Sequence, residues 1–535
     1  MPKTQKLLID TTLSRFDQSE LVLALVCPVG VDYARCIHVL QAAFERLHYI
    51  PRVISMSLLM DNLCKRFSIT APSHPKPEGQ RIRSRMELGN SLREKTQSDA
   101  VLALAAIQEI NRSRAVSQPS LPTVESSDFR PLLRNVHILA TLKRPEEADI
   151  LRKVYGTGFF LIGIHDSEKG RKDYLVDQKG IEPSTAVKLM RDDEDDNLDF
   201  GQRTRETYHL ADVFISLREN RYKEQLTRFV DLIFGHTYHT PTRDEYAMYL
   251  ASASSLRSAQ LGRQVGAAIV SKSGDLISVG CNDVPRAGGG LYWVNDKDDK
   301  RDHILGEDSN DRRKSEILTD LLTRLGCGSL NEHQKKAVKG AMLFDITEFG
   351  RAVHAEMDAI LGCARSGVSV LGSSLFTTTF PCHNCARHII AAGISRVVYI
   401  EPYVKSAAIQ LHKDAIVVRD SIEKKTKKST DFQGRIPFES FVGIGPRRYN
   451  DLFSLKPNYG RELIRKRDGK TVPWPDKDSK PRLPMHPISY LQREEIAVAE
   501  LESLDAEGRR HHGNKGEKAK LRGIRTTPQR DGEEG

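Results

Sequence analysis

Four side chains in one stretch of the chain have the types and the order needed for metal-assisted chemistry. His354 offers an imidazole and Cys382 and Cys385 offer thiolates, which are ligands that suit zinc. Three protein ligands leave the fourth tetrahedral position open, as in a catalytic zinc site. Glu356 follows the histidine by two residues and is available for proton transfer. The alternatives are a closed structural zinc site, with His383 as its fourth ligand, or two ordinary buried cysteines.

The elements around these residues follow from periodicity. Apolar residues recur at helical spacing over Val353–Ala364, which places His354 and Glu356 in the first turn of a helix. The run Leu375–Phe380 is rich in β-branched and aromatic residues and predicts a strand that stops at Pro381. The two cysteines then open a second helix, where exposed N–H groups favour thiolates.

The spacing also indicates a reaction. The order H-x-E followed by P-C-x-x-C matches the signature of the zinc nucleobase deaminases. Zinc would lower the pKa of its water toward about 7, and the resulting hydroxide would add to C4 of cytosine. Glu356 would take the proton of the water and then deliver protons to N3 and to the leaving amine. The predicted products are a uracil nucleotide and ammonia.

Length and composition limit the possible architecture and cellular location of the chain. A chain of 535 residues with 39% hydrophobic content predicts two to four globular domains. It has no apolar run of membrane-spanning length and no signal-peptide pattern at its start, so we expect a cytoplasmic protein with no membrane partner. Eight cysteines in so long a chain are more typical of metal binding than of a disulfide framework. The net charge of +10 lies mostly in a Lys-rich linker and the C-terminal tail, and it says little about the site.

The pattern of strands and helices predicts an α/β fold in two domains. Over residues 1–237, strands alternate with helices, which favours a P-loop-like parallel sheet flanked by helices. Residues 238–455 predict the zinc domain, of α/β/α type, with a charged insertion at about 291–350. Residues 456–535 are rich in Pro and Lys and predict a disordered tail. In the first domain, the acidic cluster Asp192–Asp196 predicts a solvated loop or the start of a helix, with a cation site as the alternative.

The turn after the first strand is where P-loop proteins bind phosphates. Only Gly30 remains of the P-loop pattern, Cys27 stands where the first glycine would be, and no lysine follows. Arg81, Arg85 and Arg93 could close over phosphates, or they could form a solvated helix face. The first domain is therefore either a nucleotide site, holding a nucleotide or RNA effector, or a non-hydrolysing domain that kept the turn.

Several residues of the second domain are candidates for substrate contacts. Asn282 follows a predicted β-hairpin and can offer a donor and an acceptor to a sugar hydroxyl or a base edge, although a turn asparagine is the plainer interpretation. Aromatic side chains could stack on the base, and polar ones at the end of a later strand could meet a phosphate. These further candidates are Phe380, Trp293, Tyr403, Lys405 and Ser406.

Residues from about 243 to 453 resemble the cytidine/deoxycytidylate deaminase family. The resemblance implies a five-stranded sheet flanked by helices, one catalytic Zn2+ per subunit, a small deoxycytidine nucleotide as substrate, and a homo-oligomer. Nearly everything up to residue 453 also resembles bacterial anti-phage deaminases that join a P-loop-like domain to a deoxycytidylate deaminase domain. That likeness implies deamination of dCTP, dCMP or both, which depletes nucleotides needed for phage replication. The segments that carry these resemblances are His354–Glu356, Pro381–Cys385, Gly280–Pro285, Leu142–Glu147, Val154–Gly156 and Phe441–Tyr449.

Two other functions stay open. An RNA or single-stranded DNA cytosine or adenine deaminase would need a basic groove with stacking aromatics, and the 7% aromatic content without aromatic–basic interleaving speaks against one. A non-catalytic nucleotide-sensing module would have no need of Glu356, so the presence of this residue favours an enzyme.

Overall fold

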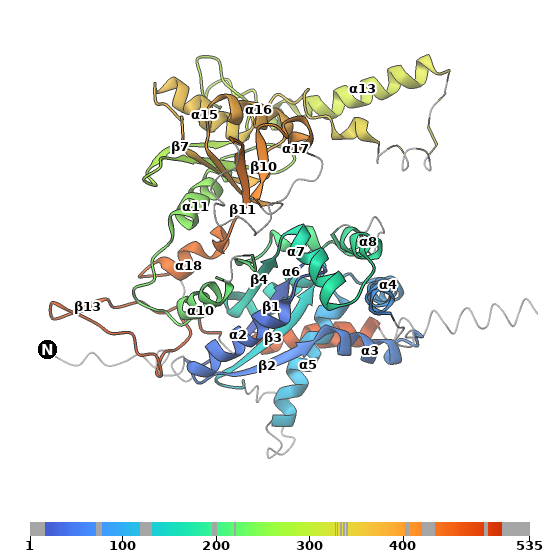
Figure 1. The fold of residues 1–535 in the computed structure, drawn as a ribbon, viewed down its shortest axis with the longest axis vertical. Helices are drawn as coiled ribbons and strands as arrows, with labels where there is room; N and C mark the ends of the chain where they lie inside the picture. Colours follow the sequence, from blue (N-terminus) through green and yellow to red (C-terminus); the bar gives the residue numbers. More distant parts are fainter. Residues whose placement is uncertain are drawn as a thin grey trace, which may run out of the picture. The chain divides into compact units, whose positions relative to one another are not determined.

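The structure is a computed structural model that divides into two compact units, each of which is described by itself (Figure 1). The first unit comprises Met1–Ala211, Glu219–Tyr238 and Leu455–Gly535, and the second comprises Asp212–Arg218 and His239–Ser454. The residues that the structure describes are 17–70, 77–117, 131–194, 201–218, 221–326, 328, 330–331, 334, 338, 341–401, 406–419, 434–458, 460–485 and 490–504.

A parallel sheet forms the centre of the first unit. Its strands lie side by side in the order β4-β1-β3-β2, and each neighbouring pair is parallel. Every residue of β1 is buried, because an apolar run without alternation suits a strand covered on both faces. Ligands of such sheets bind beyond the carboxyl ends of the strands. The strand bounds are β1 Leu21–Val26, β2 Ile50–Ser55, β3 Asn135–Leu142 and β4 Phe159–His165.

Helices surround this sheet (Figure 1). Helix α2 packs beside α10, and α5 packs against α3 and α6. A short hairpin, β13–β14, belongs to the C-terminal part of the unit. The bounds are α2 Tyr33–Arg46, α3 Met56–Arg66, α4 Glu78–Thr96, α5 Val101–Ser117, α6 Pro145–Tyr155, α7 Glu168–Asp173, α8 Pro183–Glu194, α9 Thr204–Tyr208, α10 Tyr222–Ile233, β13 Lys466–Arg467 and β14 Lys470–Thr471.

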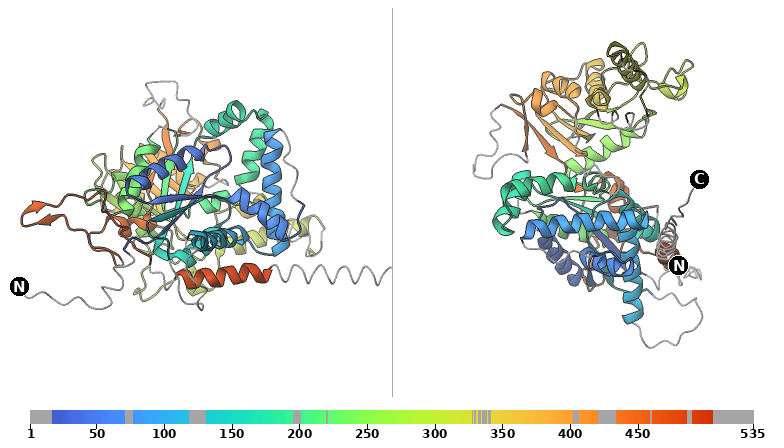
Figure 2. Two further views of the ribbon diagram at one scale, coloured as in Figure 1. Left: turned by 90° about the horizontal axis from the view of Figure 1, so that it is seen from below. Right: turned by 90° about the vertical axis from the view of Figure 1, so that its right-hand side faces the viewer.

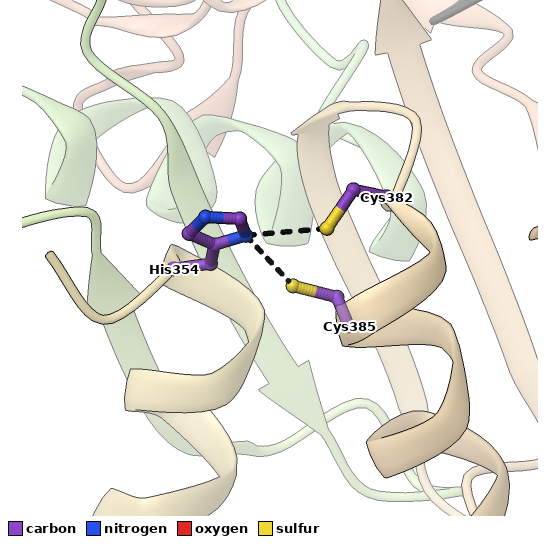
Figure 3. A group of neighbouring side chains, drawn as sticks. All are labelled: His354, Cys382 and Cys385. Atoms are coloured by element: carbon purple, nitrogen blue, oxygen red, sulfur yellow. Dashed lines mark hydrogen bonds between the residues drawn. The ribbon is translucent and has the colours of Figure 1, made fainter. Parts of the chain in front are cut away.

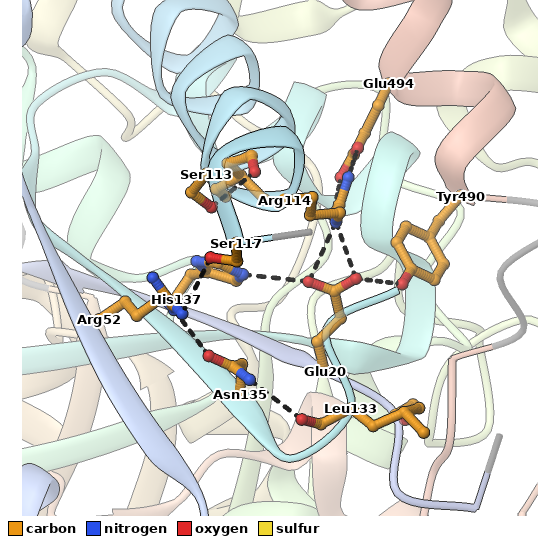
Figure 4. Close-up of polar contacts among 12 residues, drawn as sticks. Glu20, Arg52, Ser113, Arg114, Ser117, Leu133, Asn135, His137, Tyr490 and Glu494 are labelled. Carbon is orange, nitrogen blue, oxygen red and sulfur yellow. Dashed lines mark hydrogen bonds and ion pairs between the residues drawn. The ribbon is translucent and has the colours of Figure 1, made fainter. Parts of the chain in front are cut away.

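The structure corrects the prediction of a disordered tail from residue 456. Residues 490–504 form a helix that lies against the first unit (Figure 2). Leu491 and Leu501 on this helix are buried. Tyr490 donates a hydrogen bond to Glu20 (2.5 Å), and Glu494 pairs with Arg114, whose Nη2 lies 2.7 Å from its Oε1 (Figure 4). Two buried carboxylates that share one guanidinium thus tie this helix to the start of β1, a contact that composition could not reveal.

The second unit is built on a mixed sheet in the order β10-β11-β9-β8-β6-β7. The β6–β7 hairpin and the β6–β8 pair are antiparallel, and the remaining pairs are parallel. This sheet has six strands where the resemblance implied five, because β11 enters between β9 and β10 with Phe438 fully buried. The bounds are β6 Gly266–Val270, β7 Leu276–Cys281, β8 Ser374–Thr379, β9 Arg396–Glu401, β10 Ile416–Val418 and β11 Ile436–Ser440.

Two glycines let helices approach this sheet closely. A Cβ on Gly266 would lie 1.9 Å from the backbone oxygen of Ala251 in α11, and a Cβ on Gly280 would lie 2.3 Å from that of Ala355 in α15. Strand β12 runs antiparallel to β5. The remaining bounds of this unit are β5 Val213–Ser216, α11 Arg243–Ser255, α12 Asp302–Leu305, α13 Ser309–Arg324, α15 Ala355–Arg365, α16 His383–Ala391, α17 Ala408–Leu411, β12 Gly443–Ile444 and α18 Tyr449–Phe453.

The expected α/β class with parallel-rich sheets is confirmed. The P-loop-like character of the first unit stays a prediction. Among the described residues, no helix combines the length and the apolar character needed to cross a membrane.

Candidate active site

The three candidate metal ligands stand at the beginnings of two helices (Figure 3). His354 is the residue immediately before α15, and Cys382 is the residue immediately before α16. Cys385 lies in the first turn of α16 and is fully buried. The unpaired N–H groups of a helix's first turn stabilise a nearby thiolate, so the local fold supports the ionised ligands.

The geometry of these ligands fits zinc. The Nδ1 atom of His354 lies 3.3 Å from the Sγ of Cys382 and 3.3 Å from the Sγ of Cys385. All three ligand atoms lie within 4.8 Å of one another. Tetrahedral zinc, with bonds of about 2.3 Å to sulfur and about 2.0 Å to nitrogen, requires a nitrogen–sulfur separation of roughly 3.5 Å. The observed separations need little adjustment, so the predicted Zn2+ cofactor fits these residues.

The pKa values within the group favour one thiolate, at Cys382, because the pKa of Cys385 is raised well above its ordinary value by its hydrogen bond with Cys382 and by burial. A hydrogen bond from Cys385 lowers the pKa of the Cys382 thiol to about 4, against the opposing effect of burial. A hydrogen bond with Cys382 raises the pKa of His354. A thiolate therefore forms inside the cluster, and thiolate is the form of cysteine that binds zinc.

Glu356 lies where a proton carrier is needed. Its carboxyl is 3% exposed, and its Oε2 lies 3.4 Å from the Sγ of Cys385. Burial raises the pKa of Glu356 above its ordinary value. A carboxyl whose pKa is raised can both accept a proton and deliver it again within one reaction cycle.

His383 does not join the metal ligands. Its Nε2 is hydrogen-bonded to Oε1 of Glu348 at 2.8 Å. Among the described residues, only His354, Cys382 and Cys385 form a group that could hold a metal ion. This arrangement favours an open fourth position over a closed structural site. Sequence reasoning missed Glu348, because it belongs to the charged insertion and no local pattern links it to the cysteine turn.

The side chains of Asn282 and Ser406 both form hydrogen bonds with backbone groups near the site. The Asn282 side chain accepts a hydrogen bond from the Val265 N–H (2.7 Å) and donates one to the Arg263 carbonyl (2.8 Å). The neighbouring Asp283 bridges to Val353, next to the histidine ligand. An amide has one further N–H and one further lone pair, so Asn282 can still contact a substrate.

Ser406 donates to the carbonyl of Pro381 (2.8 Å) and accepts from the N–H of Ala408 (3.2 Å). Its hydroxyl therefore steadies the cysteine turn and the start of α17. A phosphate contact by Ser406 stays a prediction.

The ring of Phe380 lies in the hydrophobic core, and its stacking on a base stays a prediction. Its ring is buried and packs 4.8 Å from the ring of Tyr399 and 5.4 Å from that of Phe438, so Phe380 belongs to the hydrophobic core. Trp293 is 55% exposed, and the guanidinium of Arg257 lies 3.6 Å from its ring centre. Tyr403 and Lys405 lie outside the described residues.

The candidate nucleotide residues of the first unit contact other groups of the chain, and their contact with a phosphate stays a prediction. Each of the three arginines contacts a carboxylate, and Gly30, at φ +91°, packs closely on Arg171. Burial raises the pKa of the Cys27 thiol to about 12, so this residue is neutral. The arginine pairs are Arg81–Glu78, Arg85–Asp61 and Arg93–Glu147.

Comparisons with known proteins agree with the geometry. Residues 241–401 match the model of the cytidine and deoxycytidylate deaminase zinc-binding region. A probable deoxycytidylate deaminase of Drosophila melanogaster is 29% identical over 35% of this chain and 77% of its own length. The human deoxycytidylate deaminase is 26% identical over 35% of this chain and 84% of its own length. ComE operon protein 2 of Bacillus subtilis is 38% identical over 16% of this chain and 46% of its own length.

Proposed function

Since residues 241–401 match the zinc-binding region of the cytidine and deoxycytidylate deaminase family, we propose that this chain removes the amino group of a deoxycytidine nucleotide by hydrolysis of the bond between C4 and the amino nitrogen. The proposed products are the deoxyuridine nucleotide and ammonia. The observation that carries the proposal is the convergence of His354, Cys382 and Cys385, with the buried Glu356 beside them. The relatives named as deoxycytidylate deaminases support the choice of a deoxycytidine nucleotide as substrate.

Each residue of the site has a separate role in the proposed reaction. Zinc, when bound, would supply a nucleophile at neutral pH by acidifying water. Glu356 would receive the proton of that water and pass protons to N3 of the cytosine and to the departing amine. Its burial favours this role, because a raised pKa makes the carboxyl both an acceptor and a donor within one cycle. Asn282 would orient the sugar or base with its remaining donor and acceptor.

Two more specific parts of the proposal rest on the resemblance to the anti-phage deaminases. We propose dCMP, dCTP or both as the substrate, and a role in phage defence through depletion of these nucleotides. A homo-oligomer and an effector bound to the first unit belong to the same proposal. The arginines that could have held an effector's phosphates are ion-paired, so an effector would have to displace carboxylates or bind elsewhere.

The test is to incubate the zinc-loaded full chain with dCMP, dCTP and a cytosine-rich single-stranded oligonucleotide and to measure ammonia and uracil. We expect turnover of at least one free nucleotide. Uracil that appeared only in the oligonucleotide would replace the proposal with a nucleic-acid deaminase.

Glu356→Gln is the matched variant for this experiment. It keeps the size of the side chain and removes the titratable carboxyl, so zinc content should be unchanged while the rate falls by about 10²–10⁴-fold. A Glu356→Gln protein with wild-type rates would rule out the proposed role of this carboxyl. An inactive wild type that still holds zinc would favour a sensing module.

A further inference from the structure

A cavity of about 320 Å³ lies at the carboxyl ends of β1 and β3 in the first unit. Its walls come from the turn after β1, from α3 and α4, and from Lys143 and Asp193. Small-molecule sites have volumes of about 300–1,000 Å³, so this cavity suits a small ligand. The edge where it opens is also the one at which parallel α/β sheets bind their ligands.

The donors that a phosphate would need at this turn already serve a carboxylate. The N–H of Val29 donates to Oδ2 of Asp193 at 2.8 Å, and Lys143 donates to its Oδ1 at 2.6 Å. Lys143 also donates to the carbonyl of Cys27 at 2.9 Å. Asp193 is fully buried, in contrast to the solvated loop that its acidic cluster predicted. In phosphate-binding turns, a backbone N–H and a lysine hold the anion, and here Asp193 is that anion.

The arginines of the wall are neutralised in the same way. A polyphosphate would have to displace three carboxylates from these pairs, of which that of Glu147 is buried and those of Glu78 and Asp61 are partly exposed. Lys179 is exposed and lies 5.5 Å from the centre of the Tyr174 ring. The neutralised pairs are Arg81–Glu78 (2.7 Å), Arg85–Asp61 (3.0 Å) and Arg93–Glu147 (3.2 Å).

The rest of the wall suits an uncharged ring. Three methionines line it, and thioethers pack well against aromatic rings. Gln202 also lines the cavity, is 6% exposed, and its Oε1 has no hydrogen-bond partner. The Nε of Arg93 is likewise buried without a partner. Gln202 and Arg93 both line the cavity, and an amide acceptor with a guanidinium donor can match the mixed donor and acceptor edge of a nucleobase. The three methionines are Met56, Met60 and Met86.

We propose that this cavity binds an uncharged heteroaromatic ligand of nucleoside size, and that Asp193 excludes nucleoside triphosphates from it. The proposal is independent of the deaminase reaction, because every wall residue belongs to the first unit.

The test uses the full chain labelled with ¹³C at its nine methionine methyl groups. The probes are adenosine, guanosine and thymidine, each beside its triphosphate, at millimolar concentrations. We expect one nucleoside to shift the signals of Met56, Met60 and Met86, and its triphosphate to leave them in place. The signal of Met248, which is buried in the second unit, is the internal control.

Two results would overturn the inference, and both come from the wild-type protein alone. A triphosphate that shifts the three signals as strongly as its nucleoside would show that Asp193 excludes nothing. If no nucleoside shifts any of them, the cavity is not a ring-binding site.

Variants then assign the residues. Gln202→Leu should weaken nucleoside binding by about tenfold, because the ligand loses its partner in the wall. Asp193→Asn keeps an acceptor for Val29 and frees Lys143, so a triphosphate should now bind at least about tenfold more tightly. Asp192→Asn is the matched control, because Asp192 is partly exposed and lies 3.9 Å from Arg83. Equal triphosphate binding by both Asn variants would refute the role of Asp193.

Discussion

Replacing Gly280 with alanine should displace the helix that carries Glu356 and follows His354. The new Cβ would lie 2.3 Å from the oxygen of Ala355 and 2.4 Å from the nitrogen of Ala359. Both are backbone atoms of α15, so no change of rotamer can relieve the contact. Ordinary contact begins at 3.4 Å, and α15 must therefore move from β7 by about 1 Å.

A displacement of this size has three measurable effects. Overpacking should cost the second unit about 1–3 kcal/mol of unfolding free energy. A ligand imidazole that moves away from two thiolates should weaken zinc binding by roughly 10–100-fold. A proton carrier misplaced by about 1 Å should slow turnover by a further factor of about 10² at saturating zinc. The assays are thermal unfolding, competition with a chelator, and deamination of the nucleotide that the wild type accepts.

Gly362→Ala is the matched control, because Gly362 lies in α15, the helix that Gly280 contacts. Its Cβ would lie 2.8 Å from Oγ of Ser278, a side-chain atom that can rotate away. Alanine in a helix interior is favoured over glycine by about 0.5–1 kcal/mol, so zinc content and rate should stay at wild-type values. A Gly280→Ala protein with full zinc and full rate would show that the close packing of α15 on β7 does not position the site.

Three further outcomes follow from the contacts. Cys385→Ser should abolish zinc binding and activity, whereas His383→Ala should keep its zinc in metal analysis, because that imidazole contacts Glu348 and not the cluster. Glu494→Leu should remove one of the two carboxylates paired with the buried Arg114, leaving Glu20, and destabilise the first unit by about 1–3 kcal/mol in denaturant unfolding, with zinc content unchanged. Asn282→Ala should leave a backbone N–H and a carbonyl unpaired and cost about 1–3 kcal/mol, so an unchanged unfolding midpoint would show that its two bonds contribute nothing.

The site was predictable where its chemistry is local. His354 and Glu356 are two residues apart and the cysteines are three apart, so their types and spacing predict one metal group before any fold is known. The β6–β7 hairpin was predicted for a similar reason, since its two strands are joined by a short turn. When residues are close in the sequence, their spacing alone limits how far apart their side chains can lie.

Long-range pairings were not predictable in this way. Asp193 lies in an acidic run that is typical of solvated loops, and only the fold brings it to Val29 and Lys143, far away in the sequence. The helix of residues 490–504 follows a stretch whose Pro and Lys content predicted disorder, and its buried Glu494 depends on an arginine almost 400 residues earlier. Composition describes what a segment is made of and does not identify its partner.

The division of the chain also determines how a deletion can test whether the first unit restrains the deaminase site. The first unit is made of segments on both sides of the second, so a deletion of residues 1–238 removes Glu20 and Arg114 but leaves Tyr490 and Glu494, with the apolar side of their helix uncovered. Loss of activity in that protein would not separate lost regulation from aggregation. The shortest continuous fragment that contains the whole second unit, with β5 and its partner β12, is 212–454. If that fragment binds zinc and turns over nucleotide at the full-chain rate, the first unit does not restrain the site.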